Sequence, residues 1–520
     1  MSEIDQKVPS KKDSESSEQW RRHGYLDARW AYLDDSGPMT LVSQWERRWV
    51  EDPTAVVMRD VGTGRTISAG HMEEETARRA RALRGLGVQR SSRVALSILD
   101  PVEFVLCYAA VLRSGAIAVP LNPHYRPREA LSIFEDALPS VLIADRTEAQ
   151  SELNELLQVP HITPTFDSLH QLSFAEELVQ PAPEDGALML YTSGTTGRPK
   201  GVVHTHSALA GSTNSLGIAW RWSSEDCLTL SLPLFHMHGL GVGVHGALSR
   251  GSMLQVSSGF DTSSLLAEIG RGATSLFFGV PTLYGSLMNH TNRGALAKVR
   301  LAVSGSAPLP ETLFHSISAA TGQKVLERYG MTETVMILSN PYEGERRPGT
   351  VGFELPGVEV KLAQGDSGEI LVRGSSTFHG YWRRQSANVD AFDSEGWFRT
   401  GDIGQRDRDG YVSIVGRSKE LIISGGYNVY PREIENVLEG LPGVAECAVV
   451  GRPSERWGEE VVAVIVATAA GSPTVAQLNS WCRDHLVNYK VPKEYIFVES
   501  LPRNHMGKVV RSELEARVRS

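Results

Sequence analysis

Short apolar runs alternate with helical patterns through the first four hundred residues, and this rhythm constrains the fold more than any other feature. A strand is predicted at RVALSIL (93–99), then a helix at PVEFVLCYAAVLRSG (101–115) and a second strand at AIAVPLN (116–122). The same order recurs around SVLIAD, CLTLSLPL and SLFFGVP. Strands that are apolar throughout are typical of parallel sheets buried between helices. The sequence therefore predicts an α/β fold of parallel sheets flanked by helices.

The length of 520 residues exceeds what one hydrophobic core usually organises, so two or more domains are expected. After about residue 350 the strands become short and are flanked by glycine, as in GEILVRG and GYVSIVG. A new compact pattern begins near 416–419, and its first helix, YPREIENVLEGLPG, has the apolar spacing of one helix face. We predict a disordered tail at 1–18, a large domain with a small β subdomain at 19–416, and a small α+β domain at 417–520.

Charge and apolar content argue against several classes of protein. The net charge is -9 without a long basic block, which disfavours nonspecific nucleic-acid binding. The longest apolar run lies near VVAVIVATAA (461–470), far short of the roughly 20 residues that span a bilayer. The polar N-terminus lacks the apolar core of a signal peptide. Cysteines occur at 107, 227, 447 and 482 without metal-ligand spacing, so we expect free thiols in a cytoplasmic protein.

The stretch YTSGTTGRPKG (191–201) holds three glycines, five hydroxyl side chains and one lysine. Glycine loses the most conformational freedom on folding, so such a segment implies that the backbone must approach a ligand closely. Backbone N–H groups and hydroxyls are suited to wrap phosphate oxygens. The stretch is not a Walker loop, because Lys200 follows a proline and lies three residues beyond Gly197. We therefore predict a phosphate-binding loop of another kind.

This stretch resembles the signature loop of the adenylate-forming superfamily, which includes acyl-CoA synthetases, luciferases and amino-acid adenylation domains. Further segments resemble that family's motifs and follow its order: SGSAPL (304–309), ERYGMTET (327–334), GWFRTGDIG (396–404), GRSKELIISGGYNVYPREIE (416–435) and LPRNHMGKVVR (501–511). The resemblance covers most of the chain. It implies a large nucleotide-binding domain that also holds the acyl pocket, followed by a small mobile catalytic domain.

The resemblance also implies where ATP would bind. The β- and γ-phosphates would be held by Thr192, Ser193, Gly194, Thr195, Thr196, Gly197 and Lys200. The adenine site would be formed by Ser304, Gly305, Ser306, Glu327, Arg328, Tyr329, Gly330 and Met331. Tyr329 would stack beside the base. Asp402 would accept hydrogen bonds from both ribose hydroxyls, and Arg417 would reach the ribose or the phosphates.

The family's reaction accounts for the remaining polar residues. A carboxylate attacks the α-phosphate of ATP, which gives an acyl-adenylate and pyrophosphate, and the thiol of coenzyme A then displaces AMP. Because an anion meets a polyanion, cations and hydrogen-bond donors must dominate the site. Thr332 would contact the α-phosphate, Glu333 would bind Mg²⁺ as a hard oxygen ligand, and Lys508 would bridge the attacking carboxylate and the α-phosphate. His236 would lie beside the acyl pocket as a gate.

Family members carry out the two half-reactions by swinging the small domain. Lys419 matches the pivot position, and Ser424, Gly425 and Gly426 match the strand that lines the pantetheine tunnel. Glycine suits the close approach of a thin ligand arm. The resemblance thus implies ATP, Mg²⁺ and coenzyme A as cofactors and a small carboxylic acid as substrate.

The stretch FHMHGLGVGVHGAL (235–248) bears on which acid is used. Amino-acid adenylation domains usually carry an aspartate there, and this stretch has no acidic residue. With the segment ERYGMTETVMILSNPYEGERRPGTVG, it most resembles malonyl-CoA synthetases, which implies that Arg250 faces the second carboxylate of malonate. On its position alone, Arg250 is better explained as a surface residue that ends a helix, where positive charge suits the helix dipole.

Two alternatives to a ligase for malonate or a methylmalonate-type acid stay open at this point. One is an acyl-CoA synthetase for fatty or aromatic monocarboxylates. The other is a catalytically silent relative that binds nucleotides or partners, against which the intact Lys200, Glu333, Asp402 and Lys508 argue.

Overall fold

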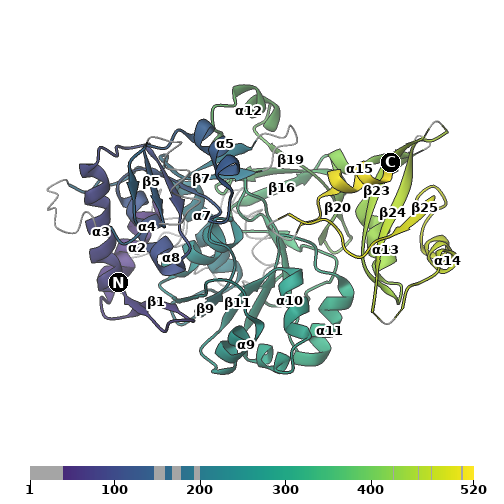
Figure 1. Cartoon of the computed structure of the whole chain (residues 1–520), viewed down its shortest axis with the longest axis horizontal. Helices are drawn as coiled ribbons and strands as arrows, with labels where there is room; N and C mark the ends of the chain where they lie inside the picture. Colours follow the sequence, from purple (N-terminus) through teal and green to yellow (C-terminus); the bar gives the residue numbers. More distant parts are fainter. Residues whose placement is uncertain are drawn as a thin grey trace, which may run out of the picture.

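The computed structural model describes residues 39–145, 159–166, 177–192, 199–424, 427–454, 456–469, 471–504 and 508–519. The tail predicted at 1–18 lies outside these residues. The predicted α/β fold is confirmed: a large part is built on two mainly parallel sheets, and a smaller part follows at the C-terminus (Figure 1). Among the described residues, none of the helices combines the length and the apolar character that a bilayer crossing requires.

The first large sheet has the strand order β18-β8-β7-β4-β3-β5-β6. Its strands are β3 (Arg93–Ser97), β4 (Ile117–Pro120), β5 (Val141–Ala144), β6 (His161–Ile162), β7 (Gly186–Thr192), β8 (Lys200–Thr205) and β18 (Gly380–Tyr381). Every residue of β4 and β5 is buried, which explains their uniformly apolar sequences. β8 pairs antiparallel with β7, unlike the parallel strands expected from the sequence. The connection between them is too short for a helical crossover, so a hairpin forms.

The second large sheet has the order β15-β14-β13-β12-β11-β9-β10-β1-β2. Its strands are β1 (Val56–Asp60), β2 (Thr66–Ser68), β9 (Cys227–Leu230), β10 (Met253–Val256), β11 (Leu276–Gly279), β12 (Leu301–Ser304), β13 (Leu326–Tyr329), β14 (Leu338–Ser339) and β15 (Phe353–Glu354). Six neighbouring strands of this sheet are parallel, namely β13, β12, β11, β9, β10 and β1. At the two edges, β2, β14 and β15 pair antiparallel.

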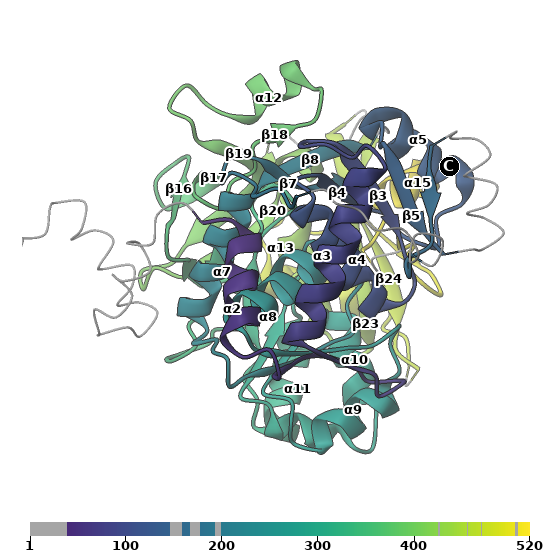
Figure 2. The ribbon, with the colours of Figure 1, turned by 90° about the vertical axis from the view of Figure 1, so that its left-hand side faces the viewer.

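Helices cover both faces of each large sheet. They are α2 (Leu41–Glu51), α3 (Ala69–Gly85), α4 (Pro101–Arg113), α5 (Pro127–Ala137), α7 (His206–Ala219), α8 (His245–Arg250), α9 (Thr262–Gly270), α10 (Pro281–Met288) and α11 (Glu311–Thr321), with the shorter η3 (His238–Val244) and η4 (Arg293–Lys298). The largest apolar cluster joins α2, α4, α7 and α8 to both sheets, so the main core lies between the sheets (Figure 2). Neighbouring residues of β11 show the alternation: Phe278 faces this core, and Phe277 faces α9, α10 and α11.

The remaining elements form two smaller sheets. β16 (Val358–Leu362), β17 (Ser367–Gly374), β19 (Phe398–Arg406) and β20 (Val412–Arg417) make an antiparallel sheet, with α12 (Gln385–Ala391) nearby. The C-terminal part contains η5 (Ser418–Glu420), β21 (Ile422–Ser424), β22 (Tyr427–Val429), α13 (Pro431–Glu439), β23 (Val444–Ser454), β24 (Gly458–Ala467), α14 (Val475–His485), β25 (Glu494–Phe497) and α15 (Arg511–Arg519). The chain passes from one small sheet to the other between Arg417 and Ile422.

Candidate active site

The stem of the predicted phosphate loop is a β-hairpin. Thr192 at the end of β7 is the cross-strand partner of Lys200 at the start of β8, so the two predicted phosphate contacts lie side by side. The ammonium of Lys200 lies 5.2 Å from the ring centroid of Tyr381. Tyr191 donates a hydrogen bond of 2.9 Å to Asp136 and fixes the base of the hairpin. The predicted loop residues Ser193, Gly194, Thr195, Thr196 and Gly197 lie outside the described residues.

Glu333 follows β13 in a tight turn and is only 6% exposed. Its Oε1 accepts a 3.0 Å hydrogen bond from the hydroxyl of Tyr381, and burial raises the pKa of its carboxyl group. Among the described residues, no three His, Cys, Asp or Glu side chains form a metal cage. Mg²⁺ is usually bound by one or two carboxylates together with substrate phosphates. A single buried carboxylate beside a phosphate loop fits that mode.

Asp402 on β19 joins three elements of the site. Its Oδ1 accepts from the Nε of Arg417 at 2.9 Å, and its Oδ2 accepts from the hydroxyl of Tyr329 at 2.5 Å. Asp402 is 4% exposed, whereas Arg417 is largely exposed at the end of β20. The Asp402 carboxylate raises the pKa of Arg417, and burial raises the pKa of Tyr329 well above its usual value. The Asp402 carboxylate, held by the neutral Tyr329 and the cationic Arg417, thus lies where the ribose is predicted to bind.

Lys508 comes from the C-terminal part and lies within this group of charges. Its backbone is fixed by Asn504, whose amide donates to the Lys508 carbonyl at 2.9 Å and whose Oδ1 accepts from the Lys508 amide at 3.0 Å. Lys508 is an exposed residue. Partial desolvation of its ammonium by neighbouring atoms and the Arg417 guanidinium lower its pKa, and Asp402 opposes them. Arg328 and Glu333 also act on it electrostatically. The structure therefore brings together Lys508, Glu333, Asp402 and Arg417, which the sequence separates by up to 175 positions.

The two predicted adenine segments pack against each other at the ends of β12 and β13. A Cβ atom on Gly305 would lie 2.1 Å from the Cζ of Arg328, so only glycine permits this contact. Glu327 accepts from the amide of Leu309 at 2.9 Å, and burial raises its pKa to about 7. Ser304 is completely buried, and its hydroxyl has no hydrogen-bond partner among the described residues. Unsatisfied polar atoms of this kind are expected where a ligand supplies the missing partner.

Gly330 and Met331 complete the second segment. A Cβ on Gly330 would lie 2.1 Å from the carbonyl oxygen of Val335, so the turn after β13 also depends on close backbone approach. Met331 packs against an apolar cluster that contains Phe378 and Phe398. These contacts connect the turn to the small sheet that carries Asp402.

Arg328 is the most unusual residue of the site. It is 5% exposed, and its Nε and Nη2 atoms have no hydrogen-bond partner among the described residues. Burial lowers its pKa to about 9. The sequence singled Arg328 out only as part of an adenine motif; its lack of a partner could not be seen there, because the neighbours come from distant segments.

His236 and His238 follow β9 on the same edge of the sheet. His236 is half-buried, with its ring centroid 4.4 Å from that of Phe235. His238 is buried, and its Nδ1 lies 3.2 Å from the hydroxyl of Ser306, whose φ of +69° places it in the left-handed region. Burial and the nearby Arg328 charge hold the pKa of His238 well below its usual value. A neutral imidazole and a buried cation therefore lie together at the predicted acyl pocket.

The chain matches known protein families over both its large and its small part. The family model for AMP-binding enzymes matches residues 44–382, and that for the C-terminal domain of AMP-binding enzymes matches residues 433–508. The chain belongs to the AMP-binding enzyme family. The acyl-CoA synthetase branch predicted from the motifs is confirmed, because relatives over 30% identical across most of the chain are CoA ligases.

Two named CoA ligases and one solved structure are similar to this AMP-binding enzyme over most of its length. A malonate–CoA ligase of Arabidopsis thaliana is 35% identical over 480 residues, which are 83% of this chain and 79% of the relative. A feruloyl-CoA synthase of Amycolatopsis is 34% identical over 491 residues, 91% of this chain and 97% of the relative. The crystal structure of ATP-bound MatB from Rhodopseudomonas palustris has a TM-score of 0.87 and 35% identity, and the match covers 93% of this chain and 99% of MatB.

In this AMP-binding enzyme, Arg250 is not brought together with the other predicted site residues. β9 and β10 are parallel, so the helices between them run from the carboxyl end of β9 to the amino end of β10. His236 follows β9, whereas Arg250 ends α8 just before β10, at the opposite edge of the sheet. The Nε of Arg250 donates to the carbonyl of Trp222 at 3.1 Å, and its guanidinium packs on Gly217 of α7. Ligands of open α/β sheets bind at the carboxyl edge.

The predicted hinge and coenzyme A residues follow directly after Arg417. Lys419 is exposed in η5, between the two small sheets. Ser424 is buried at the end of β21, where it pairs with Gly458 of β24. Gly425 and Gly426 lie outside the described residues.

Proposed function

We propose that this acyl-CoA ligase activates malonate or a methylmalonate-type dicarboxylate with ATP and transfers the acyl group to coenzyme A. A carboxylate oxygen of the acid forms a bond to the α-phosphorus, and the bond from that phosphorus to the pyrophosphate breaks. The thiolate of coenzyme A then attacks the acyl carbon and releases AMP. The sum is acid, ATP and coenzyme A giving acyl-CoA, AMP and pyrophosphate.

The observation that carries the dicarboxylate assignment is the buried, unpaired guanidinium of Arg328. The adjacent Glu327 acts on Arg328 electrostatically but accepts its hydrogen bond from the Leu309 amide instead. A buried cation without a hydrogen-bonded counter-ion is unfavourable unless a ligand pairs with it. A second carboxylate on the substrate would supply that charge, and a guanidinium can bind a carboxylate through two parallel hydrogen bonds. Neutral His238 and Ser306 lie on the same side of the site and add polar atoms without adding charge. We therefore assign to Arg328 the role that the sequence resemblance suggested for Arg250.

The other predicted site residues would bind different groups of ATP and the acid in the first half-reaction. Lys200 and the hairpin stem would hold the β- and γ-phosphates, and Asp402 with Arg417 would hold the ribose. Thr332 would donate to the α-phosphate. Lys508 would neutralise the approach of the substrate carboxylate to that phosphate, an interaction that strengthens as charge develops. A magnesium ion bound by Glu333 and the phosphates would supply further charge neutralisation.

Relatives with known activities support both the proposal and its main competitor. The malonate–CoA ligase of Arabidopsis thaliana favours a small dicarboxylate. The feruloyl-CoA synthase, at nearly the same identity, shows that a relative of this kind also serves an aromatic monocarboxylate. Arg328 supports the dicarboxylate proposal, because a monocarboxylate would leave its Nε and Nη2 atoms buried without a hydrogen-bond partner.

We also propose that residues 417–520 act as the mobile catalytic domain, with the pivot at Lys419 and the pantetheine contacts at Ser424, Gly425 and Gly426. The nearness of Lys508 to Asp402, Arg417 and Glu333 supports this proposal, because adenylate formation would need the lysine beside the residues proposed to bind ATP. A cytosolic location is part of the proposal, since all four cysteines are buried free thiols.

A pyrophosphate-release assay over a panel of acids, with and without coenzyme A, tests the proposed function. We expect the highest kcat/KM with malonate or methylmalonate, and steady turnover only when coenzyme A is present. Butyrate, octanoate and benzoate should be poor substrates. A preference for octanoate or benzoate would replace the proposal by a general acyl-CoA synthetase, and the absence of pyrophosphate release with every acid would favour a silent relative.

A further inference from the structure

The turn that carries Thr332 and Glu333 is fixed from outside by two hydrogen bonds to its backbone. The amide of Phe378 donates to the carbonyl of Glu333 at 2.8 Å. The ring Nε2 of His204 lies 2.6 Å from the carbonyl oxygen of Thr332. Two residues further on, Val335 has a φ of +57°, a left-handed backbone that β-branched residues rarely adopt. The turn is therefore held in a conformation that its own sequence would not select.

His204 serves this contact as a neutral donor. It is completely buried, and burial lowers its pKa to about 4, so the imidazole is uncharged near neutral pH. A carbonyl oxygen can only accept, so the Nε2 atom carries the ring proton. The hydrogen bond thus fixes both the tautomer of His204 and the position of the Thr332 carbonyl.

The place of His204 on β8 connects this contact to the phosphate site. Side chains two residues apart on a strand share a face, so Lys200, Val202 and His204 point to the same side of β8. Val202 packs in the cluster that contains Met331, which precedes Thr332. The same strand therefore presents the lysine predicted to bind phosphate and, four residues later, the imidazole that holds the adjacent turn.

We propose that His204 is a positioning residue for adenylate formation: through its hydrogen bond to the Thr332 carbonyl, it aims Thr332 at the α-phosphate and holds the adjacent Glu333 in the position from which it would bind Mg²⁺. The inference rests on the proposed function, because it assumes that this turn contacts ATP. Small displacements of groups that act in a transition state lower rates strongly, about 10²-fold for an error near 1 Å. Ground-state binding of ATP depends more on the Lys200 hairpin and on Asp402.

The test is the acid-dependent exchange between ATP and pyrophosphate, measured for His204→Leu and His204→Gln with malonate or the best acid of the panel. Leucine removes the donor, and we expect kcat for exchange to fall on the order of 10- to 100-fold while the KM for ATP changes less than about threefold. Glutamine keeps an N–H at a similar reach and should restore most of the rate. His204→Asn, whose amide is too short to reach the carbonyl, should behave like the leucine variant.

Two further measurements separate positioning from a general loss of structure. Formation of acyl-CoA from supplied acyl-adenylate should stay near the wild-type rate in every variant, because that step does not use the turn. The matched control is His206→Leu, since His206 is also completely buried and its ring nitrogens have no hydrogen-bond partner among the described residues. In this control, the ratio of the exchange rate to the rate of acyl-CoA formation should stay unchanged even if the thermal unfolding midpoint falls.

The outcomes are distinguishable. A wild type without acid-dependent exchange would overturn the proposed function and the inference with it. If the wild type is active, two results would overturn the inference alone. One is an equal exchange rate for leucine, asparagine and glutamine at position 204. The other is an equal fall in the rates of both half-reactions. A loss of exchange in His206→Leu equal to that in His204→Leu would have the same consequence.

Discussion

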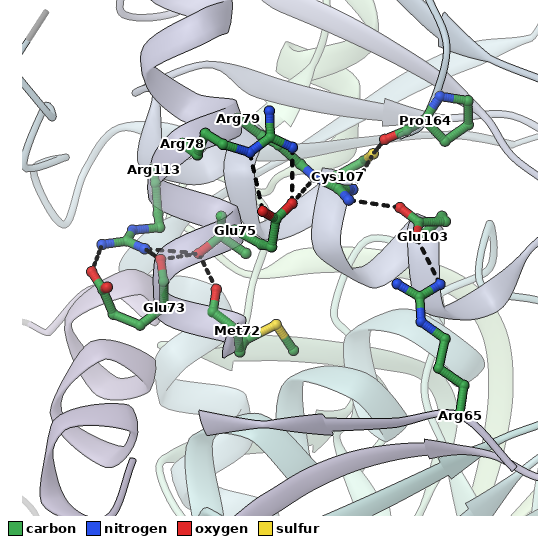
Figure 3. Close-up of polar contacts among 11 residues, drawn as sticks. Arg65, Met72, Glu73, Glu75, Arg78, Arg79, Glu103, Cys107, Arg113 and Pro164 are labelled. Carbon is green, nitrogen blue, oxygen red and sulfur yellow. Dashed lines mark hydrogen bonds and ion pairs between the residues drawn. The ribbon is translucent and has the colours of Figure 1, made fainter. Parts of the chain in front are cut away.

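Arg79 and Arg113, which lie between α3 and α4, are as deeply buried as Arg328, but their surroundings are the opposite (Figure 3). Arg79 contacts the carboxylates of Glu75 at 3.3 Å and Glu103 at 2.8 Å. Its Nη1 also donates to the sulfur of Cys107 at 3.3 Å, and burial raises the pKa of that thiol to about 12, so the sulfur stays neutral. The contacts of Arg79 with Glu103 and Cys107 join α3 to α4, and its contact with Glu75 lies within α3.

Arg113 is paired in the same way. Its Nη2 lies 2.9 Å from a carboxylate oxygen of Glu46 and 2.9 Å from one of Glu73, and its Nη1 donates to Thr76 and to the carbonyl of Glu73 at 2.7 Å each. The network connects α2, α3 and α4 across the core. Its arginines are structural, because the protein itself supplies every counter-charge.

Arg328, in contrast, has no carboxylate of the protein bound to its guanidinium among the described residues. The adjacent Glu327 is turned toward the amide of Leu309 instead. Buried ion pairs contribute little net stability, but an unpaired buried ion is strongly unfavourable. The comparison supports the proposal that Arg328, which has no carboxylate of the protein hydrogen-bonded to it, binds a charge that arrives with the ligand.

Arg328→Met should produce the largest effect on activity. Removing one partner of a buried ion pair typically costs roughly 3–5 kcal/mol, so kcat/KM for malonate should fall by about two to four decades. The free energy of unfolding should stay constant or increase, because the variant loses an unpaired buried charge. Arg328→Lys should recover only part of the activity, since lysine lacks the planar fork. An unchanged kcat/KM for malonate, together with an unfolding transition at lower denaturant, would make Arg328 a structural arginine.

Arg79→Met should produce the opposite pair of results. Glu75 and Glu103 would lose their buried cation and keep only the more exposed Arg78 and Arg65. The free energy of unfolding should therefore fall by roughly 1–3 kcal/mol. The kcat/KM of the folded fraction should stay within about twofold, because the network lies away from the site. Denaturant titration and steady-state kinetics on the same samples measure both quantities. A selective loss of activity at constant stability would contradict the distinction between the two regions.

Buried histidines show a third way to place an ionisable group in the core, which is to keep it neutral. Burial lowers the pKa of His206 to about 4, below the value of about 6.5 expected in the unfolded chain. The unfolded state then binds a proton more readily, so stability is lost as the pH falls from about 6.5 toward 4, by roughly 2 kcal/mol at pH 5. In His206→Leu, the stability difference between pH 7.5 and pH 5 should shrink by about that amount. An identical pH dependence in both proteins would show that His206 is not held neutral.

Arg250→Ala should have the smallest effect. The side chain ends α8 at the amino edge of the sheet and donates to the Trp222 carbonyl. We expect kcat/KM for malonate to change less than about threefold, which corresponds to about 0.6 kcal/mol. Steady-state kinetics with malonate and butyrate provide the measurement. A loss of two decades confined to dicarboxylates would return the substrate role to Arg250 and leave Arg328 without one.

The fold was predictable because its strongest signals are local. The uniformly apolar strands β4 and β5 and the helix between β3 and β4 follow from hydrophobic pattern alone. The antiparallel pairing of β8 was not predicted, because a strand's direction depends on the length of its connection as well as on its own residues. The motifs also named residues from distant segments, including Asp402 and Lys508, that the structure brings together.

Pairing of charges could not be read from the sequence. Arg250 and Arg328 are both single arginines in family-like motifs, and only the three-dimensional arrangement shows which edge of the sheet each one occupies. Tyr381 and His204, which contact Glu333 and Thr332, were missed for the same reason: their partners are 48 and 128 positions away. A local signal for His204 was its spacing of four residues from Lys200, which places both side chains on one face of a strand.

We propose above that Arg328 binds the second carboxylate of the substrate. A thermodynamic cycle tests it most directly: kcat/KM is measured for wild type and Arg328→Met, each with malonate and with 3-methylbutanoate, in which an isopropyl group replaces the second carboxylate. We expect a coupling free energy of roughly 3–5 kcal/mol between Arg328 and that carboxylate, with 3-methylbutanoate as good a substrate for the variant as for the wild type or a better one. A coupling near zero, with both acids losing activity equally, would contradict it.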